Sequence, residues 1–149
     1  MWSFLNRNSG GIQALAGFLT VLLALAALLG VKFQIDAADR IQRAQSARDI
    51  YREYLNVAIN KPEFAKPDYC ALAPTQQGVA YEHFVEYMLY TAEQTIAADA
   101  DWQVTFGEAL KPHAKYICSL DDVDGYSASV NEMLRIFKIE ECAAHLPCN

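Results

Sequence analysis

The four cysteines are the residues of this chain whose type and spacing offer the most definite chemistry. They stand at Cys70, Cys118, Cys142 and Cys148. In an up-down-up-down bundle the loops after the first and third helices lie at one end, so Cys70 and Cys118 can meet there. Cys142 and Cys148 are close in sequence at the far end of the last helix. We therefore predict the disulfides Cys70–Cys118 and Cys142–Cys148 in an oxidising compartment, and four free thiols in the cytoplasm.

Three further patterns contain metal-ligand residue types, but each is incomplete. The segment Cys142-Ala-Ala-His145-Leu-Pro-Cys148 supplies three zinc ligands where four are usual. His83 and Glu86 lie three apart, yet a di-iron bundle needs Glu-x-x-His twice with two further Glu. Asp122-Val-Asp124-Gly125 is similar to a calcium loop, but its first and twelfth positions would be Leu120 and Asn131. We predict no metal and no cofactor.

Established catalytic patterns do not occur in the sequence. It contains no Gly-rich phosphate loop, no Gly-x-Ser-x-Gly, no His-Glu-x-x-His and no Cys-x-x-Cys-His. The sequence therefore predicts that the protein is not an enzyme.

The N-terminal region predicts a membrane anchor. No charged residue occurs between Arg7 and Lys32. About twenty helical residues span roughly 30 Å, the thickness of the hydrocarbon layer. A cleaved signal peptide is the alternative, but its apolar core is usually shorter and ends at a polar break. We predict a tail over 1–9, a retained transmembrane helix over 10–33 and a domain over 34–149.

Two sets of side chains are candidates for an interaction face. In the anchor, Gly10, Ala14, Gly17 and Ala24 share one helical face, and small residues let another helix approach closely in lipid. Such stripes also arise by chance in Ala-rich anchors. In the domain, Tyr87 and Tyr90 fall off the predicted core stripe, and exposed aromatic rings are frequent interface anchors as well as ordinary surface residues.

The charges bear on sidedness and on partners. The C-terminal flank of the anchor has Lys32, Arg40, Arg43 and Arg48 against Arg7 on the other flank, which favours a cytoplasmic domain. Four cysteines, an even number, favour the periplasm instead. We predict a cytoplasmic domain, with a periplasmic one as the alternative. Residues 61–149 carry six basic and fourteen acidic side chains, which excludes nucleic acid as a natural partner. Membrane lipid, another membrane protein or a second copy remain as partners.

The domain reads as an antiparallel helical bundle, so the predicted fold class is all-α. The anchor continues into a stalk because no Gly or Pro interrupts residues 33–61. Apolar spacing predicts helices over 34–60, 78–98, 102–118 and 129–141. The predicted core stripes of the last three are Tyr81, Phe84, Val85, Met88, Leu89, Ala92 and Ile96, then Trp102, Thr105, Phe106, Ala109, His113, Tyr116 and Ile117, and then Val130, Met133, Leu134 and Phe137.

Local signals add detail to this bundle. The predicted buried face of the stalk consists of Ile41, Ala44, Arg48, Tyr51, Leu55, Ala58 and Ile59. Residues 61–77, with three prolines, predict a loop. Pro112 should kink the third helix. Ser129 and Glu132 have the spacing of a capping box at the start of the last helix.

Three segments resemble a group of uncharacterised bacterial single-pass membrane proteins with a small helical domain. They are Ser46-Ala-Arg-Asp-Ile-Tyr-Arg-Glu-Tyr-Leu55, Pro62-Glu-Phe-Ala65 and Tyr81-Glu-His-Phe-Val-Glu-Tyr-Met-Leu89. The resemblance covers residues 36 to about 140 and implies a bacterial inner-membrane setting. It implies no activity and no site residue.

We therefore expect a membrane-anchored interaction protein, such as a small subunit or assembly factor of a larger membrane complex. The alternative is a membrane-tethered sensor that binds a small ligand between helices, near Pro112 and His113.

Overall fold

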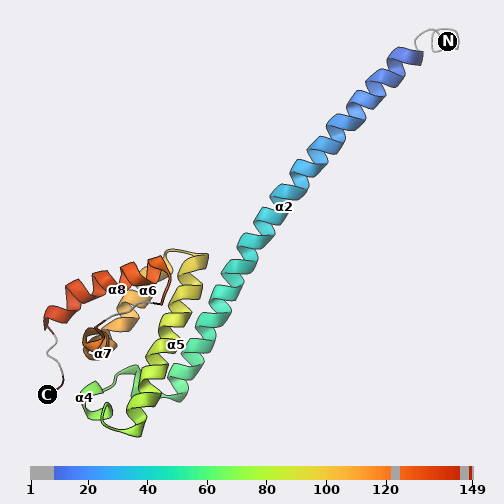
Figure 1. Ribbon diagram of the computed structural model, residues 1–149. Coiled ribbons are helices and arrows are strands. Elements are labelled where there is room, and N and C mark those ends of the chain that lie inside the picture. The colour runs from blue at the N-terminus through green and yellow to red at the C-terminus, as the bar shows by residue number, and fades with distance from the viewer. Residues whose placement is uncertain (1–8, 122–124, 145–147, 149) are drawn as a thin grey trace. The chain divides into compact units, whose positions relative to one another are not determined.

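The computed structural model describes residues 9–121, 125–144 and 148, apart from the side chains of residues 9, 10 and 12. The regular elements of the described part are all helices, which confirms the all-α class. In chain order (Figure 1) they are α2 (Ser9–Asn60), α3 (Pro62–Ala65), α4 (Tyr69–Leu72), α5 (Gln76–Ala98), α6 (Trp102–Leu110), the 3₁₀ turn η1 (Lys111–His113), α7 (Ala114–Ser119), α8 (Ala128–Glu141) and η2 (Cys142–Ala144).

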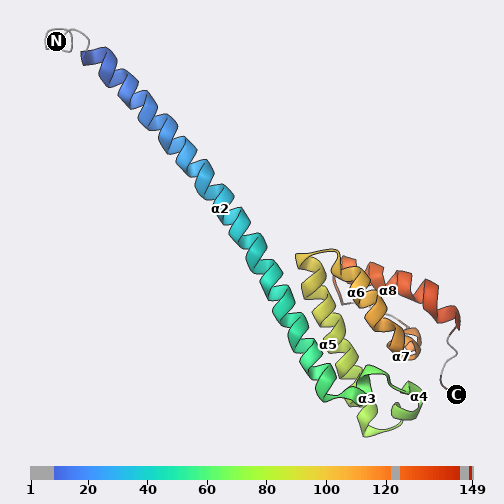
Figure 2. The same ribbon diagram turned by 180° about the vertical axis from the view of Figure 1, so that it is seen from behind.

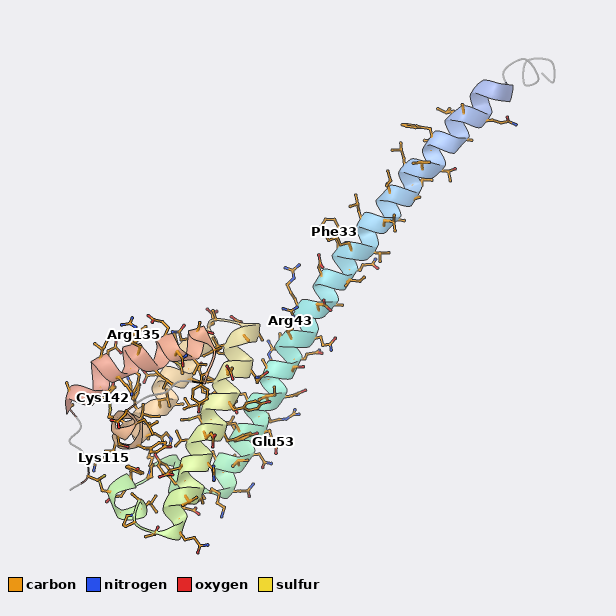
Figure 3. The ribbon with its side chains drawn as sticks, viewed as in Figure 1. Phe33, Arg43, Glu53, Lys115, Arg135 and Cys142 are labelled. Carbon is orange, nitrogen blue, oxygen red and sulfur yellow. A yellow bond between two sulfur atoms is a disulfide. The ribbon has the colours of Figure 1, made fainter. Side chains whose placement is uncertain are left out.

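Helix α2 contributes to two compact units, which divide between Gln42 and Arg43. In the first unit its large apolar side chains are exposed, for example Leu15 at 61% and Phe33 at 73%. The Phe33 side chain projects from the helix in Figure 3. By length and composition α2 can cross a membrane.

The last part of α2, from Arg43, packs through a face that only partly matches the predicted one. Tyr51 and Ala58 pack against the core as predicted. Leu55 and Ile59 are exposed at 40% and 76%, whereas Ala47 and Tyr54 are buried. The Tyr54 hydroxyl donates to the Met88 Sδ atom of α5 at 3.2 Å, and α5 runs antiparallel beside it (Figures 1 and 2). The prediction was wrong for Leu55 and Ile59, because helical spacing does not show which side of the stripe meets α5. The Tyr54 ring buries a large apolar area once its hydroxyl is bonded.

Residues 61–77 hold two short helices where the sequence predicts a loop. Pro62 occupies the first turn of α3, where a missing N–H costs no intrahelical bond. The buried Phe64 ring lies 5.9 Å from Tyr81 and 5.8 Å from Phe84. Four-residue helices are too short to show a periodic pattern, so the sequence did not reveal them.

Helix α5 is the element on which the rest of the domain packs. It contacts α4, α6 and α8, and the Tyr54 ring of α2 lies 5.9 Å from Phe84. Two buried threonines bond their hydroxyls to carbonyl groups one turn earlier in α5, which satisfies them internally. Its buried apolar residues are Tyr81, Phe84, Val85, Met88, Leu89, Ala92 and Ile96.

Pro112 does more than kink the predicted helix 102–118. Helix α6 ends at Leu110, the 3₁₀ turn η1 contains Pro112, and α7 follows as a separate element. Proline lacks the N–H that would continue the α-helical ladder, and a short 3₁₀ turn accommodates that loss.

Helix α8 begins without the predicted capping box. Its N-cap is Ser127 instead of Ser129, and the Ser127 backbone N–H donates to Glu93 of α5 at 2.6 Å. Glu132 pairs with Arg135 at 2.6 Å instead of turning back to the helix start. The cap is therefore a tertiary contact, which local spacing cannot reveal.

Gly78 marks a close approach between α5 and the segment before it, and this yields a stability prediction. A Cβ at Gly78 would lie 2.7 Å from the Leu72 carbonyl oxygen and 2.9 Å from that of Ala73. We expect Gly78→Ala to lower the unfolding free energy by about 1–3 kcal/mol, because backbone atoms must shift. Thermal unfolding of the full chain in mild detergent, followed by circular dichroism, measures this.

Gly107→Ala is the matched control, because a Cβ at Gly107 meets nothing within 4 Å. Alanine there should raise helix stability by up to about 1 kcal/mol. Equal effects of the two substitutions would contradict the close approach at Gly78.

Candidate functional site

The cysteines form two disulfides whose pairing differs from the predicted one. Cys70 is bonded to Cys148 and Cys118 to Cys142, with Cα–Cα distances of 5.3 and 5.5 Å. The predicted bonds Cys70–Cys118 and Cys142–Cys148 are therefore wrong. The prediction assumed one kinked helix over 102–118, whereas the chain breaks at η1, and α7 contacts α4, α8 and η2. Cys118 therefore lies at the end of α8, next to Cys142.

The two disulfides close large parts of a small domain. Their sequence separations are 78 and 24 residues. In the chain-entropy model each closure destabilises the unfolded state by roughly 3–5 kcal/mol. That is a large contribution for a domain whose five short segments, α3, α4, η1, α7 and η2, have six residues or fewer each.

A buried hydrogen bond joins α5 to the η1 turn. The Tyr81 hydroxyl and the His113 Nδ1 atom are 2.9 Å apart, and the two residues are exposed at 0% and 2%. Burial lowers the pKa of His113 to about 4, and burial likewise raises the pKa of Tyr81. At neutral pH the pair is uncharged, and the tautomer of His113 decides whether the Tyr81 hydroxyl or the Nδ1–H group donates.

Aromatic side chains fill the space around this pair. The His113 ring lies 5.9 Å from Phe84, and the Tyr81 ring lies 5.7 Å from Tyr116 and 5.8 Å from Tyr69. Two cavities, of about 380 and 270 Å³, are lined by other side chains. His113 is therefore a core residue, and the binding of a small ligand between helices near Pro112 stays a prediction.

The larger of these cavities is a surface groove between α6 and α8, which we call the α6–α8 groove. Its volume is about 380 Å³. Val104 and Gly107 line it from α6, and Met133, Ile136 and Phe137 line it from α8. Met133 and Phe137 are buried, with 4% of each residue exposed. Val104 is 74% exposed and Ile136 is 37% exposed. The groove thus has an apolar floor and exposed apolar walls.

Carboxylates surround the α6–α8 groove. Asp101, Glu108, Glu140 and Glu141 line it together with the cation Lys111. The Lys111 ammonium donates to Glu108 at 2.7 Å. This hydrogen bond raises the pKa of Lys111, and the charges of Glu141 and Glu140 add to the effect. The field at the groove is therefore negative.

A second, smaller cavity of about 270 Å³ lies between the last part of α2 and α6. Ala44 and Arg48 line it from α2, and Asp101, Trp102 and Thr105 line it from the start of α6. The Trp102 ring lies 4.8 Å from Tyr51, which holds it against α2.

The residues of the predicted interaction face have different surroundings. Ala14, Gly17 and Ala24 are exposed on α2, and Gly10 lies in that helix, but its surroundings are outside the described part. Tyr90 is 50% exposed, whereas Tyr87 is half-buried and packs against the core. The prediction that these residues bind a partner stays a prediction.

Two of the three patterns with metal-ligand residue types lie partly outside the described residues. His83 Nδ1 lies 3.1 Å from Glu86 on the exposed face of α5. His145 and residues 122–124 lie outside the described residues. Among the residues that the structure does describe, no three His, Cys, Asp or Glu side chains are grouped to hold a metal ion.

The sequence analysis did not identify the residues of the α6–α8 groove. Val104 and Ile136 are large apolar residues that fall off the predicted core stripes, and Gly107 is a glycine inside a helix. These are the signals that point to a surface contact, because an off-stripe apolar side chain must lie exposed.

Comparison with known proteins gives no relative: no family model, curated protein or solved structure matches the chain. The resemblance to uncharacterised bacterial membrane proteins therefore stays a prediction.

The buried His113 makes stability depend on pH. The unfolded chain binds a proton at this side chain near pH 6.5, whereas the folded chain does so only near pH 4. Stability should therefore be full above pH 6.5 and fall as the pH decreases through that window, by about 1–3 kcal/mol. Thermal unfolding between about pH 7 and about pH 4.5 measures this fall.

His113→Gln should start from lower stability and lose less of it on acidification. His83→Gln is the control, because His83 is exposed, and it should follow the natural protein. An unchanged acid-dependent fall in His113→Gln would contradict the assignment.

Proposed function

We propose that this protein is a membrane-anchored interaction protein, a small subunit or assembly factor of a larger membrane complex in a bacterial inner membrane. The observation that carries the proposal is the exposed apolar surface of α2 before Arg43. Leu15, Leu23 and Phe33 are 61%, 71% and 73% exposed there. So much apolar surface requires lipid or protein to cover it.

The domain after this helix supports an interaction role over a catalytic one. Tyr81 and His113, whose pKa values burial shifts strongly, lie in the core at 0% and 2% exposure. A substrate would have to displace packed rings to reach them. The domain's exposed apolar residues, Val104 at 74% and Tyr90 at 50%, lie on the surface, where a protein partner can reach them.

We further propose that the domain faces an oxidising compartment, the periplasm. The two disulfides join cysteines that are 78 and 24 residues apart in sequence, and such bonds persist outside the reducing cytoplasm. This argument has more weight than the Lys and Arg count, because it depends on the geometry of two separate pairs. It replaces the cytoplasmic orientation that the flanking charges favour.

Size analysis of the native complex tests the interaction role. We extract the protein from its own membrane in mild detergent and run it in native electrophoresis. We expect it to migrate well above the size of one 16.6 kDa chain together with its detergent micelle. Gly17→Leu should weaken the complex, because a bulky side chain prevents close helix approach on the small-residue face.

Gly30→Leu is the matched control for this experiment. A Cβ at either glycine meets nothing within 4 Å, but Gly30 falls on the opposite helical face from Gly17. Migration of the natural protein as a single chain in its micelle would contradict the proposed function.

Thiol labelling tests the orientation. In spheroplasts, an impermeant maleimide polymer should add to the protein only after treatment with an impermeant phosphine reductant, because the cysteines are paired and outside the membrane barrier. Cys118→Ser combined with Cys142→Ser should then add half as many polymers. Labelling without reductant, and only after lysis, would place the domain in the cytoplasm.

A further inference from the structure

The α6–α8 groove places exposed apolar side chains of two helices beside buried ones. Val104 is 74% and Ile136 is 37% exposed, and they face a floor formed by Met133 and Phe137. A valley between two helices is the surface into which a third helix inserts its side chains.

Gly107 widens this valley at its centre. Glycine inside a helix costs stability relative to alanine, and at Gly107 a Cβ would meet nothing within 4 Å. Packing within the chain therefore does not require glycine here. The missing side chain leaves the α6 backbone open to the groove, where another chain can approach closely.

The charge of the groove selects its occupant. Asp101, Glu108, Glu140 and Glu141 outnumber the single cation Lys111. A partner with basic residues beside its apolar stripe is attracted electrostatically to this surface, whereas anionic lipid headgroups and acidic peptides are repelled.

We propose that the α6–α8 groove binds an amphipathic helix of another subunit, with apolar side chains inserted beside Gly107 and Lys or Arg side chains facing the acidic rim. This deepens the proposed function and rests on it. A second copy of this chain is a poor occupant, because residues 61–149 carry fourteen acidic against six basic side chains, and residues 32–60 carry four against five.

A synthetic helix tests the groove directly. The full chain is placed in phosphatidylcholine nanodiscs, with empty nanodiscs as the blank, and titrated against a fluorescent peptide of about 16 residues with a leucine stripe and lysines beside it. We expect a dissociation constant on the order of micromolar that weakens with salt. The same peptide with glutamate for lysine should bind at least about ten-fold more weakly.

Paired variants distinguish peptide binding at the groove from non-specific electrostatic or hydrophobic binding elsewhere on the surface. Val104→Asp should weaken binding about ten-fold, whereas Val79→Asp, at a valine 56% exposed on α5, should not. The double variant Glu140→Lys with Glu141→Lys should also weaken binding about ten-fold. The double variant Glu82→Lys with Glu86→Lys, on α5, should leave binding unchanged.

Gly107→Leu should fill the groove and weaken the peptide while leaving thermal stability unchanged or higher, so that a folding defect cannot explain the loss. Equal losses in test and control variants, or equal binding of the acidic peptide, would overturn the proposal.

The native complex distinguishes the two proposals. A complex that is present in the natural protein and unchanged in Val104→Asp and Gly107→Leu would remove the groove proposal and keep the proposed function. Absence of any complex in the natural protein would remove the proposed function itself.

Discussion

Packing on the apolar stripe of α5 is the interaction on which the rest of the domain depends. The helices α4, α6 and α8 contact α5, and the end of α2 reaches it through Tyr54, whose hydroxyl bonds to Met88. Several of these elements are too short to be stable alone. Their positions therefore follow from burial against α5, and so does the distance between α6 and α8 that forms the groove.

The disulfides hold in place the short segments that side-chain burial stabilises only weakly. Cys118–Cys142 ties the end of α7 to the end of α8, and Cys70–Cys148 ties α4 to a residue near the C-terminus. Both bonds act on short elements, for which side-chain burial offers little stabilisation. A domain of this kind suits an oxidising compartment, where the covalent bonds persist without further cost.

The polar groups of the core and those of the surface have different roles. His113 and Tyr81 satisfy each other inside the aromatic cluster and stay neutral, so they specify packing without offering charge to a ligand. The carboxylates gather at the rim of the α6–α8 groove, beside exposed apolar side chains. Apolar contact with charge around it is the arrangement by which interfaces combine affinity with selectivity.

The sequence alone determined the all-α class, the apolar N-terminal helix and the stripe of α5, because each is a periodic pattern over many residues. Tertiary structure decided the cysteine pairing, the replacement of Leu55 and Ile59 by Ala47 and Tyr54 in the core, and the capping of α8 by Glu93. Each of these joins segments that are distant in sequence, and the break at Pro112 redirects the chain between them. The groove also needed the structure, since Val104, Gly107 and Ile136 become one surface only when α6 and α8 lie together. Local periodicity indicates which face of a helix is apolar. It does not indicate whether that face packs on another helix, or on which one, or lies exposed to solvent.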